Sequence, residues 1–355
     1  MSILIRSLIM LLVIFEVTRG GGLPNGAEPK TATDWFRDAD DLTNIRMPGS
    51  APFHMKVTFQ AFPGIDFAKP GQSTIVTGDG TYEETWTSPE KWRREVAFGS
   101  YHAVEVRANG VRKVQASSDY EPSRVLMLLD ALLDPVPRTL TSRELIDDRI
   151  HWQVQHMSFG GLAYIQVSAA LPTGSSTSVL ISYVMLPDGI LVRSQNQGLV
   201  TTREADAVFG GKEFPRHLTV QAMGRNLLVA DVAIEEIRNT DSSLFVIPGQ
   251  PADAGTTLRP LQWFDVKGPQ AIRAERVSIP QDSSLPRGGA VVIIHEIIDR
   301  HGTPREAELI SAPNEKLGAP FVAACLRSQY QPAVTDGSPC EVELGRGFPV
   351  TPGGA

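Results

Sequence analysis

The sequence predicts an α+β protein that is mostly antiparallel β-sheet. A curved N-terminal sheet or half-barrel with a covering helix is followed by a small C-terminal αβ domain. Three observations predict this class: alternating apolar and polar residues recur between residues 50 and 240, short turn sequences separate these segments, and a single apolar helix interrupts them. At 355 residues the chain is long enough for two domains.

Alternation with a period of two identifies the strands. In HMKVTFQAF, Met55, Val57 and Phe59 alternate with polar residues, and Tyr82 and Trp86 share a face in TYEETWTS. One face of such a strand is buried and the other is solvated. Further strands are expected at 91–98, 101–108, 111–116, 144–154, 162–170, 179–186, 190–195, 213–222 and 226–237.

Turn sequences set the connections between these strands. Asn109-Gly110 and Asp188-Gly189 are typical of two-residue hairpin turns. Sequential strands that are joined by short polar turns form an antiparallel meander.

One helix is expected within this β-rich region, in the segment PSRVLMLLDALLDP, which Pro135 ends. Apolar residues at helical spacing cover most of its circumference: Val125, Leu128, Leu129, Leu132 and Leu133. A helix of this kind has to be covered by a sheet.

The N-terminus predicts export. Arg6 precedes an apolar run over 7–15, and three glycines at 20–22 detach this run from the rest of the chain. Residues 1–22 are therefore predicted to be a signal peptide, with a membrane anchor over residues 3–17 as the alternative. Either reading places the protein in the periplasm or cell envelope.

Charge and motif content argue against several functions. The net charge of −7 does not suit a nucleic-acid-binding surface. The sequence lacks the G-x-S-x-G, P-loop and dinucleotide-binding patterns, and its histidines do not have the spacing of a zinc motif. We therefore expect no catalytic residues, no metal and no cofactor, with an unrecognised hydrolase as a minor alternative.

Residues 266–352 contain an ordered set of elements: a strand over 291–298, the turn Arg300-His301-Gly302, a strand over 306–311, a helix over 317–327, Tyr330-Gln331-Pro332-Ala333, the turn Gly337-Ser338-Pro339 and a strand over 340–344. This order resembles the C-terminal domain of TonB-type energy transducers. The long Pro-rich linker of that family is missing, so the resemblance does not imply energy transduction.

The TonB resemblance implies a partner in the cell envelope. Such a partner would add a strand to an exposed sheet edge, where backbone pairing supplies the affinity. The predicted edge is the last strand, at Glu341, Val342, Glu343 and Leu344.

Residues 33–243 resemble lipoprotein carriers of the LolA/LolB type, through their strand order, the segment ETWTSPEKWRREV and the apolar helix. A linker over 244–265, rich in Ser, Thr, Pro and Gly, follows. The resemblance implies a half-open barrel whose apolar interior holds a lipid or acyl chain. The residues expected to line it are Phe59, Trp86, Leu128, Leu129 and Leu132; a packed core without ligand is the open alternative.

The only two cysteines, Cys325 and Cys340, both lie in the last domain. In an exported protein such a pair predicts a disulfide, with two buried thiols as the alternative. Taken together, the sequence predicts a non-catalytic cell-envelope protein that binds an apolar ligand and a protein partner. A structural or interaction protein with packed cores is the principal alternative.

Overall fold

The structure is a computed structural model that describes residues 30–65, 75–118, 121–137, 140, 151–172, 178–196, 198–204, 207–248, 261–262, 271–275, 277–279, 285, 289–335 and 338–351. The predicted signal peptide or anchor at 1–22 and most of the predicted linker lie outside these residues. No helix within the described ranges is long and apolar enough to cross a membrane.

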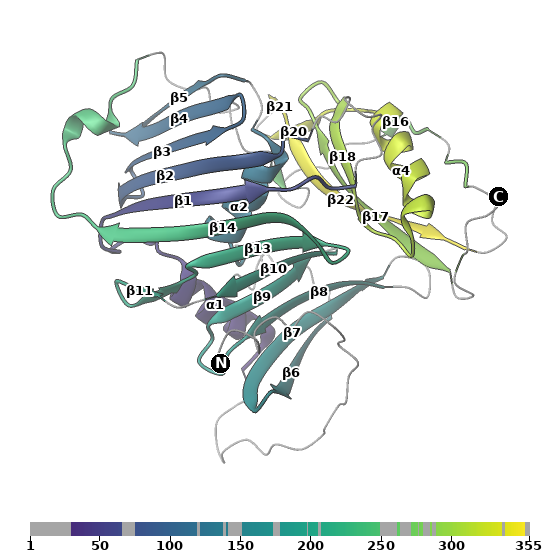
Figure 1. Ribbon diagram of the computed structural model, residues 1–355, viewed down its shortest axis with the longest axis horizontal. Coiled ribbons are helices and arrows are strands. Elements are labelled where there is room, and N and C mark those ends of the chain that lie inside the picture. The colour runs from purple at the N-terminus through teal and green to yellow at the C-terminus, as the bar shows by residue number, and fades with distance from the viewer. Residues whose placement is uncertain are drawn as a thin grey trace.

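The predicted fold class is confirmed: the protein is mostly antiparallel β-sheet, built around one large open sheet (Figure 1). This sheet has 12 strands in the order β5-β4-β3-β2-β1-β14-β13-β10-β9-β8-β7-β6. Their bounds are β1 Phe53–Ala61, β2 Gly78–Ser88, β3 Lys91–Phe98, β4 Tyr101–Ala108, β5 Val111–Ala116, β6 Trp152–Phe159, β7 Leu162–Pro172, β8 Ser178–Met185, β9 Leu191–Asn196, β10 Leu199–Glu204, β13 His217–Ala222 and β14 Arg225–Glu236.

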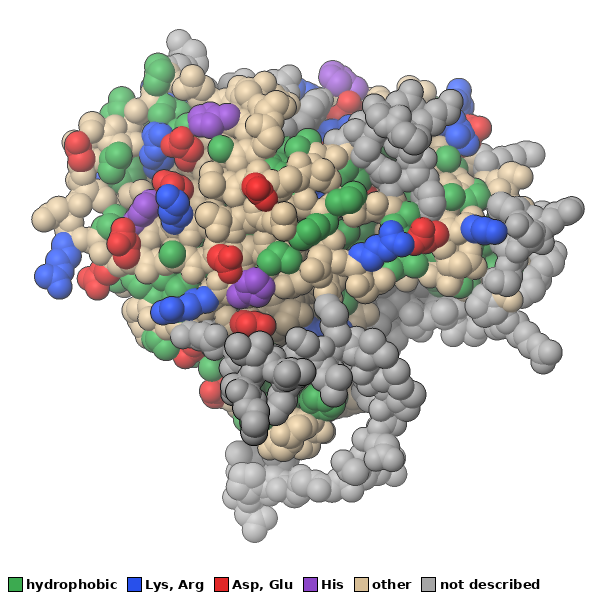
Figure 2. Space-filling model, in the orientation of Figure 1, with side chains coloured by type: hydrophobic (Ala, Val, Ile, Leu, Met, Phe, Trp, Pro, Cys, Tyr) green, Lys and Arg blue, Asp and Glu red, His purple; other side chains and the backbone are tan. Residues whose placement is uncertain are grey.

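The period-two pattern explains the central strands. On β1, Met55, Val57 and Phe59 are buried while Lys56 and Thr58 are exposed. Pairing with β2 on one side and β14 on the other brings their apolar residues to the same face of the sheet. The opposite face carries interspersed acidic, basic and histidine side chains (Figure 2).

Strand β10 was not predicted, yet it links the two halves of the sheet. It pairs with β9 on one side and β13 on the other, antiparallel in both cases. Its sequence, LVTTRE, is mostly half-buried and has only a weak alternation. A short hairpin of β11 (Ala207–Phe209) and β12 (Lys212–Phe214) follows it.

Two helices, α1 (Ala32–Thr43) and α2 (Ser123–Leu133), lie behind the large sheet in Figure 1. Helix α1 begins with a capping box, in which Thr31 and Asp34 bond reciprocally, and it packs Trp35 and Phe36 against β6 to β9. Every residue of α2 except Asp130 is buried, and the helix contacts β13 and β14. The predicted covering of an apolar helix by the sheet is therefore confirmed.

The C-terminal unit consists of a second sheet and a helix. Its sheet has the order β15-β22-β17-β18, and α4 (Glu315–Arg327) packs on one face through Leu317, Phe321 and Val322. The strands are β15 Leu261–Gln262, β17 Ala290–Ile298, β18 Pro304–Ser311 and β22 Val342–Val350. Short pairs complete it: β16 Ala271–Arg273 with β19 Gln329–Tyr330, and β20 Ala333–Thr335 with β21 Ser338–Cys340. A 3-10 helix, η2, spans Ser242–Phe245 after β14.

The two sheets share a core. Ile293 of β17 and Ile310 of β18 belong to the same buried cluster as α2 and the large sheet. The backbone N–H of Leu309 donates to the carbonyl of Ile65, at 2.8 Å, just beyond the end of β1. The free face of the C-terminal sheet is therefore packed against the large sheet and α2 (Figure 1).

Candidate functional site

The five residues that were predicted to line an apolar interior lie together. Phe59, Trp86, Leu128, Leu129 and Leu132 are all buried members of one hydrophobic cluster. The strands supply the aromatic residues through their period-two alternation, and α2 supplies the leucines. The structure therefore brings together a set of side chains that are far apart in the sequence.

Around these residues the interior is densely filled. The ring of Trp86 stacks on Phe53 with centroids 5.5 Å apart, and Phe59 packs on Phe98 at 5.1 Å. A cavity beside Leu132 has a volume of about 10 Å³. This is space for about one water molecule, far less than an acyl chain needs. Binding of a ligand here stays a prediction that requires α2 to move.

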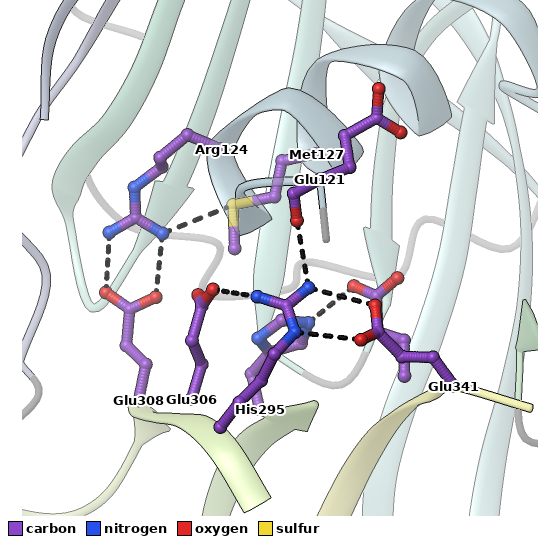
Figure 3. A network of polar contacts seen from close by, with 9 residues as sticks. Glu121, Arg124, Met127, His295, Glu306, Glu308 and Glu341 are labelled. Atoms are coloured by element: carbon purple, nitrogen blue, oxygen red, sulfur yellow. Dashed lines mark hydrogen bonds and ion pairs between the residues drawn. The ribbon is translucent and has the colours of Figure 1, made fainter. Parts of the chain in front are cut away.

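The first polar anchor of α2 is a buried ion pair. Arg124 is fully buried near the start of the helix, and its two terminal nitrogens donate to the two oxygens of Glu308 on β18, both at 2.8 Å (Figure 3). The guanidinium also donates to the carbonyl of Phe62. A bidentate, charge-assisted pair of this kind fixes the helix relative to the C-terminal unit.

A second arginine, which lies on β18, links β18 to the segment that precedes α2. Arg305 of β18 donates to both oxygens of Glu341, each at 2.9 Å, and to the backbone carbonyl of Glu121, at 2.8 Å. It also donates to the carboxylate of Glu306. The segment that leads into α2 is therefore held by Arg305, and the first turn of the helix is held by Glu308.

His295 of β17 completes this buried polar layer. Its ring Nε2 and the Glu343 carboxylate form a 2.5 Å hydrogen bond. Burial by itself lowers the pKa of His295, but Glu343, Glu308 and Glu306 around it outweigh this effect. The net result is a raised pKa, so the protonated imidazolium is favoured between these carboxylates.

Replacing His295 with Gln is expected to change how stability depends on pH. The raised folded-state pKa gives stability that is fully present below the unfolded value of 6.5 and is lost as pH rises through the folded-state pKa. Urea unfolding from about pH 6 to about pH 9 should show this loss in the wild type and not in the variant. Parallel profiles would mean that His295 does not carry the charge.

The edge that was predicted to accept a partner strand is partly occupied by the chain itself. Val342 pairs with Leu261, and Glu343 with Gln262, in parallel. The side chain of Glu341 bonds Arg305 instead of facing outward. The predicted edge is therefore covered at Val342 and Glu343, because a short segment within the predicted linker forms β15, and strand addition by a partner stays a prediction.

The predicted disulfide is absent: Cys325 and Cys340 are separate buried thiols. Cys325 packs between α4 and the sheet, and Cys340 belongs to a different hydrophobic cluster. Cys340 ends β21 and does not open the last strand, so the assumed geometry was wrong. Burial raises the pKa of Cys325 to about 12 and also raises that of Cys340, which disfavours the thiolate.

The buried charges were not singled out from the sequence. A signal did exist: Glu306 and Glu308, like Glu341 and Glu343, recur with the strand period of two. Acids on one face of an otherwise apolar strand indicate a buried polar layer as readily as a solvated one. Only the register between β17, β18 and β22 places these carboxylates opposite α2.

The outer face of the large sheet has a shallow groove of about 470 Å³ beneath residues 237–244. On its floor, Arg93 pairs with Glu95 along β3, and the ring of His54 on β1 lies beside the Glu235 carboxylate on β14. The charges of Arg93 and Glu95 offset each other in partly solvated surroundings. Within the described part of the chain, no three His, Cys, Asp or Glu side chains are placed to hold a metal ion.

No protein-family model matches the chain, and no curated protein matches it. Among solved structures, it is similar to a LolA superfamily protein from Nitrosomonas europaea, with 12% sequence identity and a TM-score of 0.32. The match covers 62% of this chain and 99% of that one. This similarity is weak, and the architecture described above rests on its own strand order and register. The TonB-like character of residues 266–352 stays a prediction.

Proposed function

We propose that the protein is an exported, non-catalytic cell-envelope protein whose large sheet binds the acyl chain of a lipid or lipidated ligand. The observation that carries this proposal is the almost wholly buried apolar helix α2, which covers the apolar face of an open sheet. Contacts between leucines and aromatic rings are non-directional, so an acyl chain can make equivalent contacts in their place.

In this proposal α2 acts as a cover that is hinged at its N-terminal end. At this end Arg124 and the backbone carbonyl of Glu121 bind β18 of the C-terminal unit. The contacts of Leu128, Leu129 and Leu132 with the sheet interior are apolar. The C-terminal half of the helix also has a polar contact, because Arg203 of β10 donates to the carbonyl of Ala131 at 2.9 Å. Movement of this end must break that one hydrogen bond, whereas the first turn is held by the bidentate pair of Arg124 with Glu308.

The C-terminal unit, residues 266–352, is proposed to engage an envelope protein by strand addition. Beyond Glu343, the outer edge of β22 from Leu344 to Val350 has no paired strand within the described part of the chain. Backbone groups along such an edge can pair with an extended peptide.

A second candidate function is an interaction protein whose interior is only a core. The specific observation that favours it is the dense packing around Trp86 and Phe59, with a cavity of only about 10 Å³ beside Leu132. Both candidate functions share the proposed location and protein partner. They differ in whether an acyl chain enters the space between α2 and the large sheet.

Titration of the full mature chain with a fluorescent fatty-acyl probe separates the two candidates. The carrier predicts saturable binding that is reversed by unlabelled fatty acid. Widening the interior by Leu132→Ala, beside the existing cavity, is expected to strengthen probe binding, because the ligand then displaces less protein. If neither the wild type nor the Leu132→Ala variant binds the probe saturably, the second candidate function, an interaction protein with a packed core, is favoured.

A further inference from the structure

Two hairpins of the large-sheet region have the same turn sequence, Phe-Gly-Gly. They lie at 159–161, between β6 and β7, and at 209–211, between β11 and β12. In both, the two glycines have positive φ: 59° and 82° in the first, 57° and 78° in the second. Two successive positive φ values are those of a tight two-residue turn, which glycine adopts without strain. The two tips can therefore be compared directly.

The second hairpin is docked on its own molecule. Phe209 packs edge-on against Phe53 with ring centroids 5.9 Å apart, and it adjoins the main hydrophobic cluster. Lys212, which pairs with Phe209 across the turn, donates to the carbonyl of Asp41 at the end of α1. The tip of this hairpin thus has both an apolar and a polar anchor.

The first hairpin has neither anchor. Its paired tip residues are Phe159 and Leu162, and they are 58% and 60% exposed. The next pair on the same face is Met157 with Tyr164, both half-buried. The four side chains form a continuous apolar patch on the face opposite Val154, which packs towards α1.

The strands that carry this patch are also free of charged residues. From His151 to Pro187, over β6, β7 and β8, the sequence contains no Asp, Glu, Lys or Arg. The other edge of the same sheet, β5, carries Arg112 and Lys113, which is how exposed edges are commonly protected. Figure 1 shows β6 and β7 at the lower end of the sheet, far from β5.

These features favour a lipid surface over a protein as the occupant. A stable protein interface needs roughly 800 Å² from each partner, which two tip side chains and their half-buried neighbours do not supply. A bilayer needs only a few apolar side chains that reach its interfacial zone, with no charge to be desolvated there. Tyr164, at the base of the patch, suits the boundary between headgroups and acyl chains.

We propose that the β6–β7 hairpin docks the protein on an uncharged lipid bilayer by inserting Phe159 and Leu162. The contact is apolar, so it needs no anionic lipid and is insensitive to salt. It is independent of any ligand in the interior, because the patch lies on the face opposite α1 and outside the α2 cluster.

The test is co-sedimentation of the full mature chain with phosphatidylcholine vesicles. Wild-type protein is expected to bind equally at low and high salt, and the double variant F159S/L162S to bind at least about tenfold more weakly. The matched control is V208S, at the docked hairpin, where Val208 is 65% exposed but beside the anchored tip; it should bind like the wild type.

Three results would overturn the proposal: no wild-type binding to these vesicles, binding that salt abolishes, or equal loss in V208S. Sedimentation velocity without vesicles tests the remaining alternative, in which the patch is a dimer interface. Suppose that the wild type is a dimer, that F159S/L162S is a monomer and that vesicle binding is unchanged. The patch then binds a second copy of the chain, and the lipid assignment is wrong. The acyl-probe titration is unaffected by either variant, so failure here is distinct from failure of the proposed ligand site.

Discussion

Replacing Glu308 with Ala is expected to lower the free energy of unfolding by about 3–5 kcal/mol. The substitution leaves the guanidinium of Arg124 buried without its bidentate partner, between α2 and β18. Urea unfolding at neutral pH, followed by tryptophan fluorescence, measures the change, since Trp86 lies in the adjoining core.

The matched control is an exposed ion pair between the two parts, Arg225 with Glu315, whose side chains are 56% and 44% exposed. Glu315→Ala should cost less than about 1 kcal/mol, because water solvates the remaining charge. The double variant R124L/E308L should recover most of the loss, since it leaves no buried charge unpaired. If E308A is no more harmful than E315A, the buried pair does not join α2 to the C-terminal unit.

Leu129→Ala is expected to cost about 2–5 kcal/mol in the same assay. Leu129 is fully buried in the cluster formed by α2 and the large sheet, so truncation removes dispersion contacts and leaves a cavity. Leu162→Ala, at the exposed hairpin tip, supplies the control and should change stability by less than about 0.5 kcal/mol. A cost below about 1 kcal/mol for Leu129→Ala would show that the interior is loosely packed, as a ligand-lined cavity would be.

Most of the fold could be predicted from the local periodicity of apolar residues in the sequence. The alternation in β1 and β2 identified the faces on which Phe59 and Trp86 are buried, and the apolar circumference of α2 required that a sheet cover it. The strands and helix of the C-terminal unit could be predicted for the same reason: β17, β18 and α4 lie within a few residues of their expected bounds.

Apart from β10, whose alternation is weak, the failures discussed here depended on contacts between distant segments. Nothing local in the two residues of β15 indicates that they cover the edge at Val342 and Glu343. The separation of Cys325 from Cys340 follows from where α4 and β21 lie, which their spacing along the chain does not determine. The pairing of Arg124 with Glu308 joins residues 184 positions apart, and the sequence alone shows only an arginine in an apolar helix.

Amide hydrogen exchange of α2, with and without the acyl probe, tests most directly whether this helix is a displaceable cover. If the probe enters between α2 and the sheet, amides of residues 127–133 should exchange faster in the complex, while those of β1 and β14 stay protected. The first turn, held by Glu308 through Arg124, should change least. Saturating probe that leaves exchange in α2 unchanged, or slows it together with the strands, would contradict the proposal that an acyl chain replaces the helix.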